Sequence, residues 1–263
     1  MRYCHFERNG KSAFGVIESV AGRDQITHLL SGRPEGRLAD VARERIDPVS
    51  LEDVRILAPV QPSKIVCVGR NYRAHAAEMG NAAPKEPLIF LKPPSSIIAP
   101  GENIVRPKLS QHTDYEGELG VIIGRRCYKL AEDTDVRPYI LGYTVVNDFT
   151  ARDLQRKDAQ WTRGKGFDTF CPVGPVVTDE IDPWAGVGVQ TRVNGAVRQD
   201  GNTSDFIFPL DVIIRFVTQF MTLMPGDLIA TGTPEGVSPV QAGDEIEVAV
   251  EGVGTLRNPV VDE

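Results

Sequence analysis

The sequence is poor in cysteine and has no long apolar run, and each shortage excludes a class of protein. Its four cysteines, Cys4, Cys67, Cys127 and Cys171, are far apart and form no CxxC pair. Such spacing favours free thiols in a reducing cytoplasm over a disulfide framework or a zinc site. No stretch approaches the roughly 20 apolar residues of a membrane span, and the charged start MRYCHFERNG lacks the apolar core of a signal peptide. We expect a cytoplasmic protein with no membrane partner.

Excess positive charge is also missing. The formal net charge of the 263 residues is −7, which argues against nucleic acid or an anionic lipid surface as a partner. A local cluster of cations can still bind a small anion in such a chain. Hydrophobic residues make up 41% and charged residues 25%, as in ordinary globular proteins, and the length suits one large domain with at most a small appendage.

Several familiar catalytic motifs are absent. There is no GxSxG, HExxH or P-loop sequence, and no GxGxxG follows an expected strand. The four histidines include no close pair, which argues against a zinc hydrolase. No serine or cysteine is marked as a nucleophile by its neighbours. The chemistry of the chain therefore has to rest on other side chains.

Two glutamates one residue apart, Glu116 and Glu118 in DYEGELGVIIG, are the most informative feature present. Side chains at i and i+2 of a strand point to the same side, so these carboxylates should lie together. Like charges that close repel each other unless a cation or a proton lies between them. All-oxygen ligands favour Mg²⁺, Mn²⁺ or Ca²⁺ over zinc. The alternative is a solvated outer face of the strand, which is the commoner place for carboxylates.

Three further side chains are candidates, each with a structural alternative. Asp148 ends an expected strand and precedes a helix, where it could serve an active site or cap the helix. His75 and Glu78 are three residues apart, so on a helix they share a face. Glu78 could then orient the imidazole as a general base, or the two could form a surface pair.

A lysine and two threonines lie beside glycines. Lys165 lies between two glycines in WTRGKGFD, so it could reach into a cleft or remain a solvated loop residue. Thr231 and Thr233 in ATGTPEG flank another glycine. Their hydroxyls and the nearby amides could bind an anion or cap a turn.

Short apolar runs separated by Gly and Pro predict a β-rich α+β fold, a mixed β-roll or barrel with few helices. Residues 1–60 form an expected small N-terminal α+β subdomain, which ends at the prolines of LAPVQPSK. Residues 61–263 form the expected catalytic domain. Its one long helix should span 209–223, where apolar residues recur at helical spacing.

Five motifs, in this order, resemble the fumarylacetoacetate hydrolase family: GRNYRAHAAEMG, DYEGELGVIIG, GYTVVNDFTARDLQ, WTRGKGFDTFCPVGP and ATGTPEGV. The likeness runs from about residue 60 to the end and is greatest to the small members. These include acylpyruvate hydrolases, oxaloacetate decarboxylases and 2-hydroxyhepta-2,4-diene-1,7-dioate isomerases. The resemblance implies the family's mixed β-roll and a homodimer.

The resemblance also implies roles for single residues. Glu116, Glu118 and Asp148 match the carboxylate ligands of Mg²⁺ or Mn²⁺, and His75 and Glu78 match a catalytic dyad on a short lid helix. Lys165 matches a lysine that holds the substrate oxyanion, while Arg152, Gln155 and Thr233 match substrate-binding residues. An additional aspartate ligand of the longer fumarylacetoacetases has no clear counterpart, which counts against fumarylacetoacetate itself as the substrate.

These observations predict a metal-dependent enzyme that acts on a small anionic 2-oxo acid or enol diacid. Three carboxylates around Mg²⁺ leave a charge of about −1, so Lys165 and Arg152 would be needed to admit an anion. We expect C–C bond hydrolysis or decarboxylation through a metal-chelated enolate. The alternative is isomerisation or tautomerisation of hydroxyheptadienedioate or oxaloacetate. Two other classes stay open, a non-catalytic scaffold and a calcium-stabilised structural domain.

Overall fold

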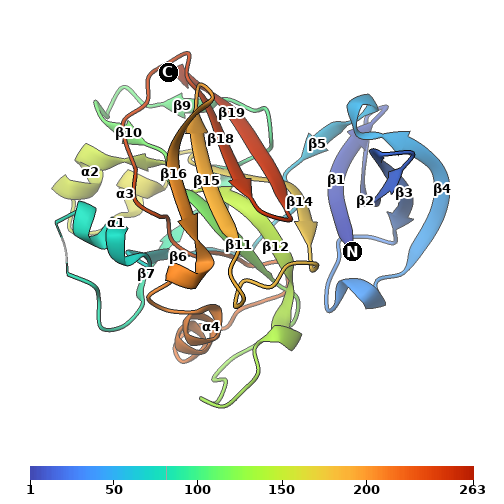
Figure 1. Ribbon diagram of the computed structural model, residues 1–263, viewed down its shortest axis with the longest axis horizontal. Helices are drawn as coiled ribbons and strands as arrows, with labels where there is room; N and C mark the ends of the chain where they lie inside the picture. The colour runs from blue at the N-terminus through green and yellow to red at the C-terminus, as the bar shows by residue number, and fades with distance from the viewer. Residues whose placement is uncertain (81) are drawn as a thin grey trace.

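The computed structural model describes residues 1–80 and 82–263 and is dominated by two β-sheets (Figure 1). The larger sheet has twelve strands, in the order β4-β3-β2-β1-β14-β12-β11-β17-β6-β7, with β5 beside β1 and β8 beside β14. The bounds are β1 Arg2–Arg8, β2 Lys11–Val20, β3 Arg23–Leu30, β4 Arg43–Ser50, β5 Arg55–Leu57, β6 Ile65–Gly69, β7 Leu88–Lys92, β8 Ile97–Ile98, β11 Gly117–Ile123, β12 Ile140–Asn147, β14 Cys171–Thr178 and β17 Leu228–Ala230.

A smaller sheet of five strands packs against the middle of the large one. Its order is β16-β15-β18-β19-β9, and a separate pair is formed by β10 with β13. Valine, isoleucine and leucine side chains from both sheets fill the space between them and form the main core. The bounds are β9 Ile104–Arg106, β10 Thr113–Asp114, β13 Thr150–Ala151, β15 Gly188–Val193, β16 Ala196–Asn202, β18 Glu245–Val250 and β19 Gly254–Asp262.

The β-rich α+β fold expected from the sequence is confirmed, and it contains no closed barrel among the described residues. Residues 1–60 lie to one side of the molecule, as Figure 1 shows in blue. This part consists of β1 to β5 and two 3-10 turns, so the α-helix content expected for it is absent. Strand β1 pairs with β14, and residues 1–60 therefore extend the large sheet instead of forming a sheet of their own.

The four α-helices of the described chain are short: α1 Arg73–Glu78, α2 Arg152–Lys157, α3 Thr162–Lys165 and α4 Leu210–Thr218. Helix α4 is shorter than the 209–223 expected. It begins after Pro209 and buries Ile213, Ile214 and Val217 against the core. It ends early because the chain then turns to pair Leu223 with Cys127 through two backbone hydrogen bonds.

The centre of the large sheet positions the functional side chains. Strand β11 lies between β12 and β17, and β17 is parallel to β6. Helix α1 follows β6, and α2 follows β12 after the short strand β13, so both helices lie at the same side of the sheet (Figure 1). No helix in the described part of the chain has the length and hydropathy to cross a bilayer.

Candidate active site

Three carboxylates meet where β11 begins and β12 ends. Glu118 is the second residue of β11, Glu116 comes one residue before the strand, and Asp148 directly follows β12. The antiparallel register places Gly117 opposite Asn147, so the start of one strand lies beside the end of the other. The Asp148 amide also donates a 2.8 Å hydrogen bond to the Glu116 carbonyl oxygen. This pairing brings together residues that are about thirty positions apart in the sequence.

The geometry of these carboxylates suits a metal ion. One oxygen from each of Glu116, Glu118 and Asp148 lies within 4.8 Å of the others. Their side chains are buried, with relative exposures of 5%, 2% and 1%. Burial excludes the alternative of a solvated outer face for the glutamate pair. Asp148 does not cap a helix either, because α2 begins only at Arg152.

Buried lysines neutralise part of this charge. Lys165 Nζ donates to Glu116 Oε2 at 2.6 Å and to Asp148 Oδ2 at 2.7 Å. Lys92 Nζ donates to the other oxygen of Asp148 at 2.6 Å and to the Phe149 carbonyl at 3.1 Å. Both lysine side chains are almost fully buried. Lys165 is therefore not the solvated loop residue that was the alternative.

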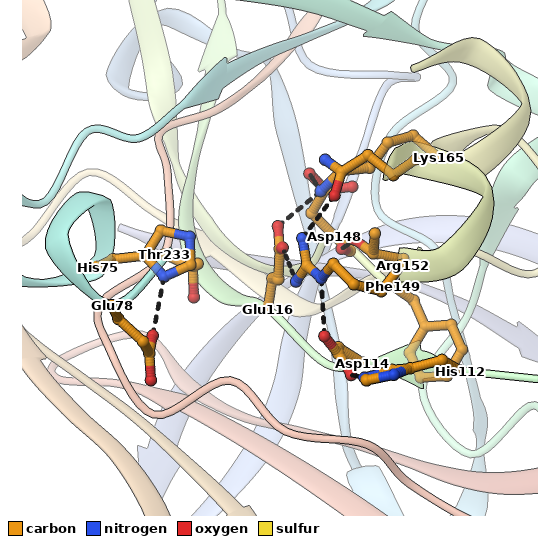
Figure 2. A network of polar contacts seen from close by, with 12 residues as sticks. His75, Glu78, His112, Asp114, Glu116, Asp148, Phe149, Arg152, Lys165 and Thr233 are labelled. Carbon is orange, nitrogen blue, oxygen red and sulfur yellow. Dashed lines mark hydrogen bonds and ion pairs between the residues drawn. The ribbon is translucent and has the colours of Figure 1, made fainter. Parts of the chain in front are cut away.

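Arg152 binds a second set of acceptors in the same cluster (Figure 2). Its guanidinium donates to Glu116 Oε1 at 2.5 Å, to Asp114 Oδ2 at 2.7 Å and to Gln155 Oε1 at 2.7 Å. His112 Nε2 in turn lies 2.8 Å from the other oxygen of Asp114. Charged hydrogen bonds of this length fix the orientation of both partners. Glu116 thus has a cation on each of its oxygens.

The two glutamates titrate in opposite directions. Burial alone would raise the pKa of Glu116, but Lys165 and Arg152 outweigh it and hold that pKa well below its usual range. Burial, followed by the charges of Asp148 and Glu116, raises the pKa of Glu118 well above its usual range. The carboxylate of Glu118 accepts a 2.8 Å hydrogen bond from the Gly232 amide but is bonded to no lysine or arginine of the described chain. A hard divalent cation fits this donor set, because it would supply the positive charge that Glu118 lacks.

A histidine–glutamate pair lies at the same cavity. His75, on α1, is 5% exposed, and its Nδ1 is 3.2 Å from Glu78 Oε2. Glu78 also accepts a 3.0 Å hydrogen bond from the Gly236 amide, which fixes its position. We infer that Nδ1 carries the ring proton, because it donates a hydrogen bond to Glu78. Nε2 is then the unprotonated nitrogen that can accept a proton. Figure 2 shows the opposite edge of the imidazole turned toward Glu116. His75 is therefore not part of a surface pair.

One small cavity joins eight of the nine residues to which the family resemblance assigns roles, and Glu78 is the exception. Its lining consists of Val68, Gly69, Arg70, His75, Met79, Phe90, Glu116, Glu118, Asp148, Arg152, Gln155, Trp161, Lys165 and Thr233. Glu78 lies behind His75.

The hydroxyl of Thr233 donates to the Gly117 carbonyl at 2.9 Å and accepts from Gln199 Nε2 at 2.7 Å, so it holds the start of β11. Thr231 is likewise bonded to the Leu119 carbonyl. The predicted contact between Thr233 and a substrate stays a prediction.

Sequence reasoning missed three polar residues of the site. Asp114 continues the alternation of Glu116 and Glu118 by two more positions, a signal that was available. Lys92 is the last residue of the apolar strand β7. A lysine that is buried with such a strand is almost always paired with an acidic partner. Arg70 lines the cavity and belongs to the motif GRNYRAHAAEMG, but no role was assigned to it from the sequence.

Comparison with known proteins identifies the lineage of this arrangement. The model of the fumarylacetoacetate hydrolase C-terminal family matches residues 64–261, and that of an Rv2993c-like N-terminal family matches residues 1–59. The chain belongs to the fumarylacetoacetate hydrolase family. The resemblance noted in the sequence is thereby confirmed.

Relatives in the fumarylacetoacetate hydrolase family carry different activities in their names. The oxaloacetate tautomerase YisK of Bacillus subtilis is 41% identical over 265 residues, 93% of this chain and 86% of that protein. A solved 5-carboxymethyl-2-hydroxymuconate delta-isomerase from Mycobacterium smegmatis has a TM-score of 0.90 and 41% identity, covering 100% of both chains. A fumarylpyruvate hydrolase from Pseudomonas aeruginosa, solved with Mn²⁺ and pyruvate, has a TM-score of 0.72 and 33% identity over 78% of this chain and 91% of that one.

Members of this family are isomerases, tautomerases and hydrolases, and they typically depend on a metal. The cluster of Glu116, Glu118 and Asp148 agrees with that general property.

Proposed function

We propose that this protein is a metal-dependent enzyme that moves a proton on short 2-oxo acids, with oxaloacetate tautomerisation as the leading candidate. One observation carries the proposal: the imidazole of His75 lines the same small cavity as the three buried carboxylates. A base oriented by Glu78 and a site for a hard cation are the two parts that keto–enol exchange requires.

Glu116, Glu118 and Asp148 would hold Mg²⁺ or Mn²⁺ in this proposal. The bound ion would act as a Lewis acid toward the keto oxygen of the substrate. Three carboxylates leave room in the octahedral shell that Mg²⁺ prefers, so the keto and carboxylate oxygens of a 2-oxo acid can enter. The small anionic substrate expected from the sequence fits this proposal.

His75 carries the proton. Nε2 takes a proton from C3 of the keto form, the C3–H electron pair becomes the C2–C3 double bond, and the C2=O π pair moves onto the oxygen. The imidazolium then gives the same proton from Nε2 to that oxygen, which forms the enol. The reverse sequence regenerates the keto form. Glu78 accepts a hydrogen bond from Nδ1–H and stabilises the imidazolium that forms between the steps. A positioned general base of this type contributes roughly 10²- to 10⁴-fold in rate.

Lys165 and Arg152 act on charge and position. Lys165 bridges Glu116 and Asp148, so it fixes both carboxylates and leaves a cation close to the developing oxyanion. Arg152 fixes the other oxygen of Glu116 and orients Gln155. We propose Gln155 and Thr233 as further substrate contacts, since both line the cavity.

C–C bond hydrolysis is the second candidate, and the solved fumarylpyruvate hydrolase supports it. The same residues would then serve a water molecule that attacks a C4 carbonyl. The sequence alone ranked cleavage or decarboxylation first, and that ranking stays untested. We place tautomerisation first because the tautomerase YisK matches 93% of this chain, including the N-terminal part.

Freshly dissolved oxaloacetate distinguishes the candidates. We expect its enol absorbance to relax faster with the Mg²⁺-loaded protein than without it, and the gain to disappear with a chelator. Pyruvate release, followed with lactate dehydrogenase, reports decarboxylation, and the loss of acetylpyruvate absorbance reports hydrolysis. A protein that only releases pyruvate or acetate would refute the tautomerase assignment, and one inactive in all three assays would refute the proposed function.

A further inference from the structure

Arg70 is a cavity cation without a counter-charge. Three arginine or lysine side chains line the cavity: Arg70, Arg152 and Lys165. Arg152 and Lys165 are bonded to Glu116 and to further acceptors. Within residues 1–80 and 82–263, Arg70 forms no ion pair with any carboxylate. Its charge is therefore available to an anion that enters the cavity.

The backbone at Arg70 is held in an unfavourable conformation. Its φ is +57°, in the left-handed region that is unfavourable for a non-glycine residue. The next residue, Asn71, is fully buried and fixes this turn. Its side chain donates to the Thr231 carbonyl at 2.8 Å and accepts from the Phe208 amide at 2.8 Å. Strain that is held in place by such bonds is typical of functional positions.

The turn directs Arg70 to the face of an aromatic ring. The guanidinium carbon lies 5.9 Å from the centre of the Trp161 ring, within range of a cation–π contact. Trp161 is itself fixed by two contacts. Its ring packs edge-to-face on Phe90, with centroids 5.2 Å apart. It also lies against Gly69, where an added Cβ would come within 2.9 Å of the Trp161 ring. Stacking leaves the N–H edge of the guanidinium free to donate to a carboxylate.

We propose that Arg70 determines substrate specificity by binding the distal carboxylate of a 2-oxo diacid. This inference rests on the proposed function, because the 2-oxo acid end must first occupy the carboxylate cluster. A diacid such as oxaloacetate would then span from the cluster to Arg70, whereas a monoacid with a neutral tail leaves Arg70 unused. The protein should therefore favour dicarboxylic over monocarboxylic 2-oxo acids.

Two inhibitors that share one head group separate this role from metal binding. N-oxalylglycine and oxamate both carry the oxalyl amide, but only N-oxalylglycine has a second carboxylate. We expect the Mn²⁺-loaded protein to bind N-oxalylglycine more tightly in calorimetric titrations. Arg70→Met should weaken that binding about 10- to 100-fold, the value of a charged hydrogen bond, and leave oxamate binding unchanged. Arg70→Lys should recover part of the loss, since it keeps the positive charge but not the two parallel N–H donors of the guanidinium.

Arg73→Met is the matched control, because Arg73 is an exposed residue of α1 outside the cavity lining. It should bind both inhibitors as the unchanged protein does. With oxaloacetate, Arg70→Met should raise KM far more than it lowers kcat. Equal weakening of both inhibitors by Arg70→Met, or no preference for N-oxalylglycine in the unchanged protein, would overturn the role of Arg70. Failure to bind either inhibitor would instead overturn the proposed function.

Discussion

Glu118 differs from its neighbours in the cluster because no cation is bonded to it. Glu116 has Lys165 and Arg152, and Asp148 has Lys92 and Lys165. A buried carboxylate without a counter-charge is costly when ionised, which is why burial and the nearby carboxylates raise the pKa of Glu118. Without a metal the site therefore favours a proton on Glu118, which a divalent cation would replace.

Glu118→Gln should abolish metal binding and metal-dependent activity while the fold is kept. The amide keeps the shape and can still accept from the Gly232 amide, but it removes the negative charge. We expect the metal-free variant to be more stable than the metal-free parent at pH 8, because the amide needs no counter-charge. Calorimetric titration with Mn²⁺ and urea unfolding measure the two effects.

Glu132→Gln serves as the control for this substitution, because Glu132 is exposed and does not line the cavity. It should leave metal affinity and stability unchanged. Full activity and unchanged Mn²⁺ affinity in Glu118→Gln would show that the carboxylate is no ligand.

His75→Ala should reduce turnover without weakening metal binding. The imidazole is the proton carrier in the proposed reaction, so its loss should cost roughly 10²- to 10⁴-fold in kcat. Glu78→Gln keeps a partner for Nδ1 but removes the charge that stabilises the imidazolium, and it should cost less. Steady-state kinetics combined with Mn²⁺ titration checks both variants. A parallel loss of turnover and metal affinity would make His75 a ligand or a structural residue.

At the scale of single residues, the sequence located candidates but not their partners. The i, i+2 spacing of Glu116 and Glu118 is a local pattern, so it is visible in the sequence itself. Lys92 contacts Asp148 across 56 positions, and only the strand order brings them together. Arg70 is distinguished by its backbone conformation and lack of a counter-charge, which no composition rule encodes.

At the scale of elements, the loop after β17 supports the cluster. Gly232 has φ +101°, and its amide donates to Glu118. A Cβ at this position would come within 2.7 Å of the Asn71 Cβ and 3.1 Å of the Val68 carbonyl oxygen. Glycine is required here for both reasons, so the loop cannot be altered without moving the donor to Glu118.

Gly232→Ala should destabilise the protein by roughly 2–5 kcal/mol, since backbone strain and a steric clash act together. Gly195 provides a matched comparison, because its φ is +77° but nothing lies within 4 Å of the position that an alanine methyl group would take. Gly195→Ala should cost only about 1 kcal/mol. Urea unfolding of the two variants gives the difference, and equal costs would contradict the close contact with Asn71.

Element types were predictable where the apolar pattern is strong. Strands β11 and β12 lie where the sequence predicted them, since Glu118 is in β11 and Asp148 directly follows β12. The end of α4 was not predictable, because the apolar spacing continues beyond Thr218 while the tertiary pairing of Leu223 with Cys127 ends the helix.

At the scale of the whole molecule, metal binding and proton release are coupled. The raised pKa of Glu118 means that the metal-free folded protein holds a proton more tightly than the unfolded chain. That contribution to stability is present at low pH and is lost as the pH rises through the folded pKa. Glu116 has the opposite shift, so its contribution is lost only as the pH falls below about 4.5, the ordinary value.

Metal affinity should therefore rise with pH above 4.5, the ordinary pKa of a glutamate, and binding should release protons from Glu118. Titrations with Mn²⁺ in two buffers of different ionisation enthalpy measure this release. The rise in melting temperature on adding metal should likewise be larger at about pH 8 than at about pH 6. An affinity independent of pH would mean that Glu118 is already ionised in the metal-free protein.

The homodimer expected from the family resemblance stays a prediction. Light scattering coupled to size-exclusion chromatography should give about twice the 28.8 kDa of one chain. A monomer with full activity would show that the site is complete within one chain. The sequence could not decide this, because a dimer interface depends on which exposed side chains share a face.

The two halves of the proposed chemistry rest on elements of unequal robustness. Strand β11 has ladder partners on both sides and is buried along its whole length, whereas α1 is a helix of six residues. Amide protons of β11 should thus exchange only through global unfolding, and those of α1 through small local openings. Mild denaturant would then displace His75 while the carboxylate cluster stays intact. Catalytic activity should therefore be lost at a lower denaturant concentration than metal binding.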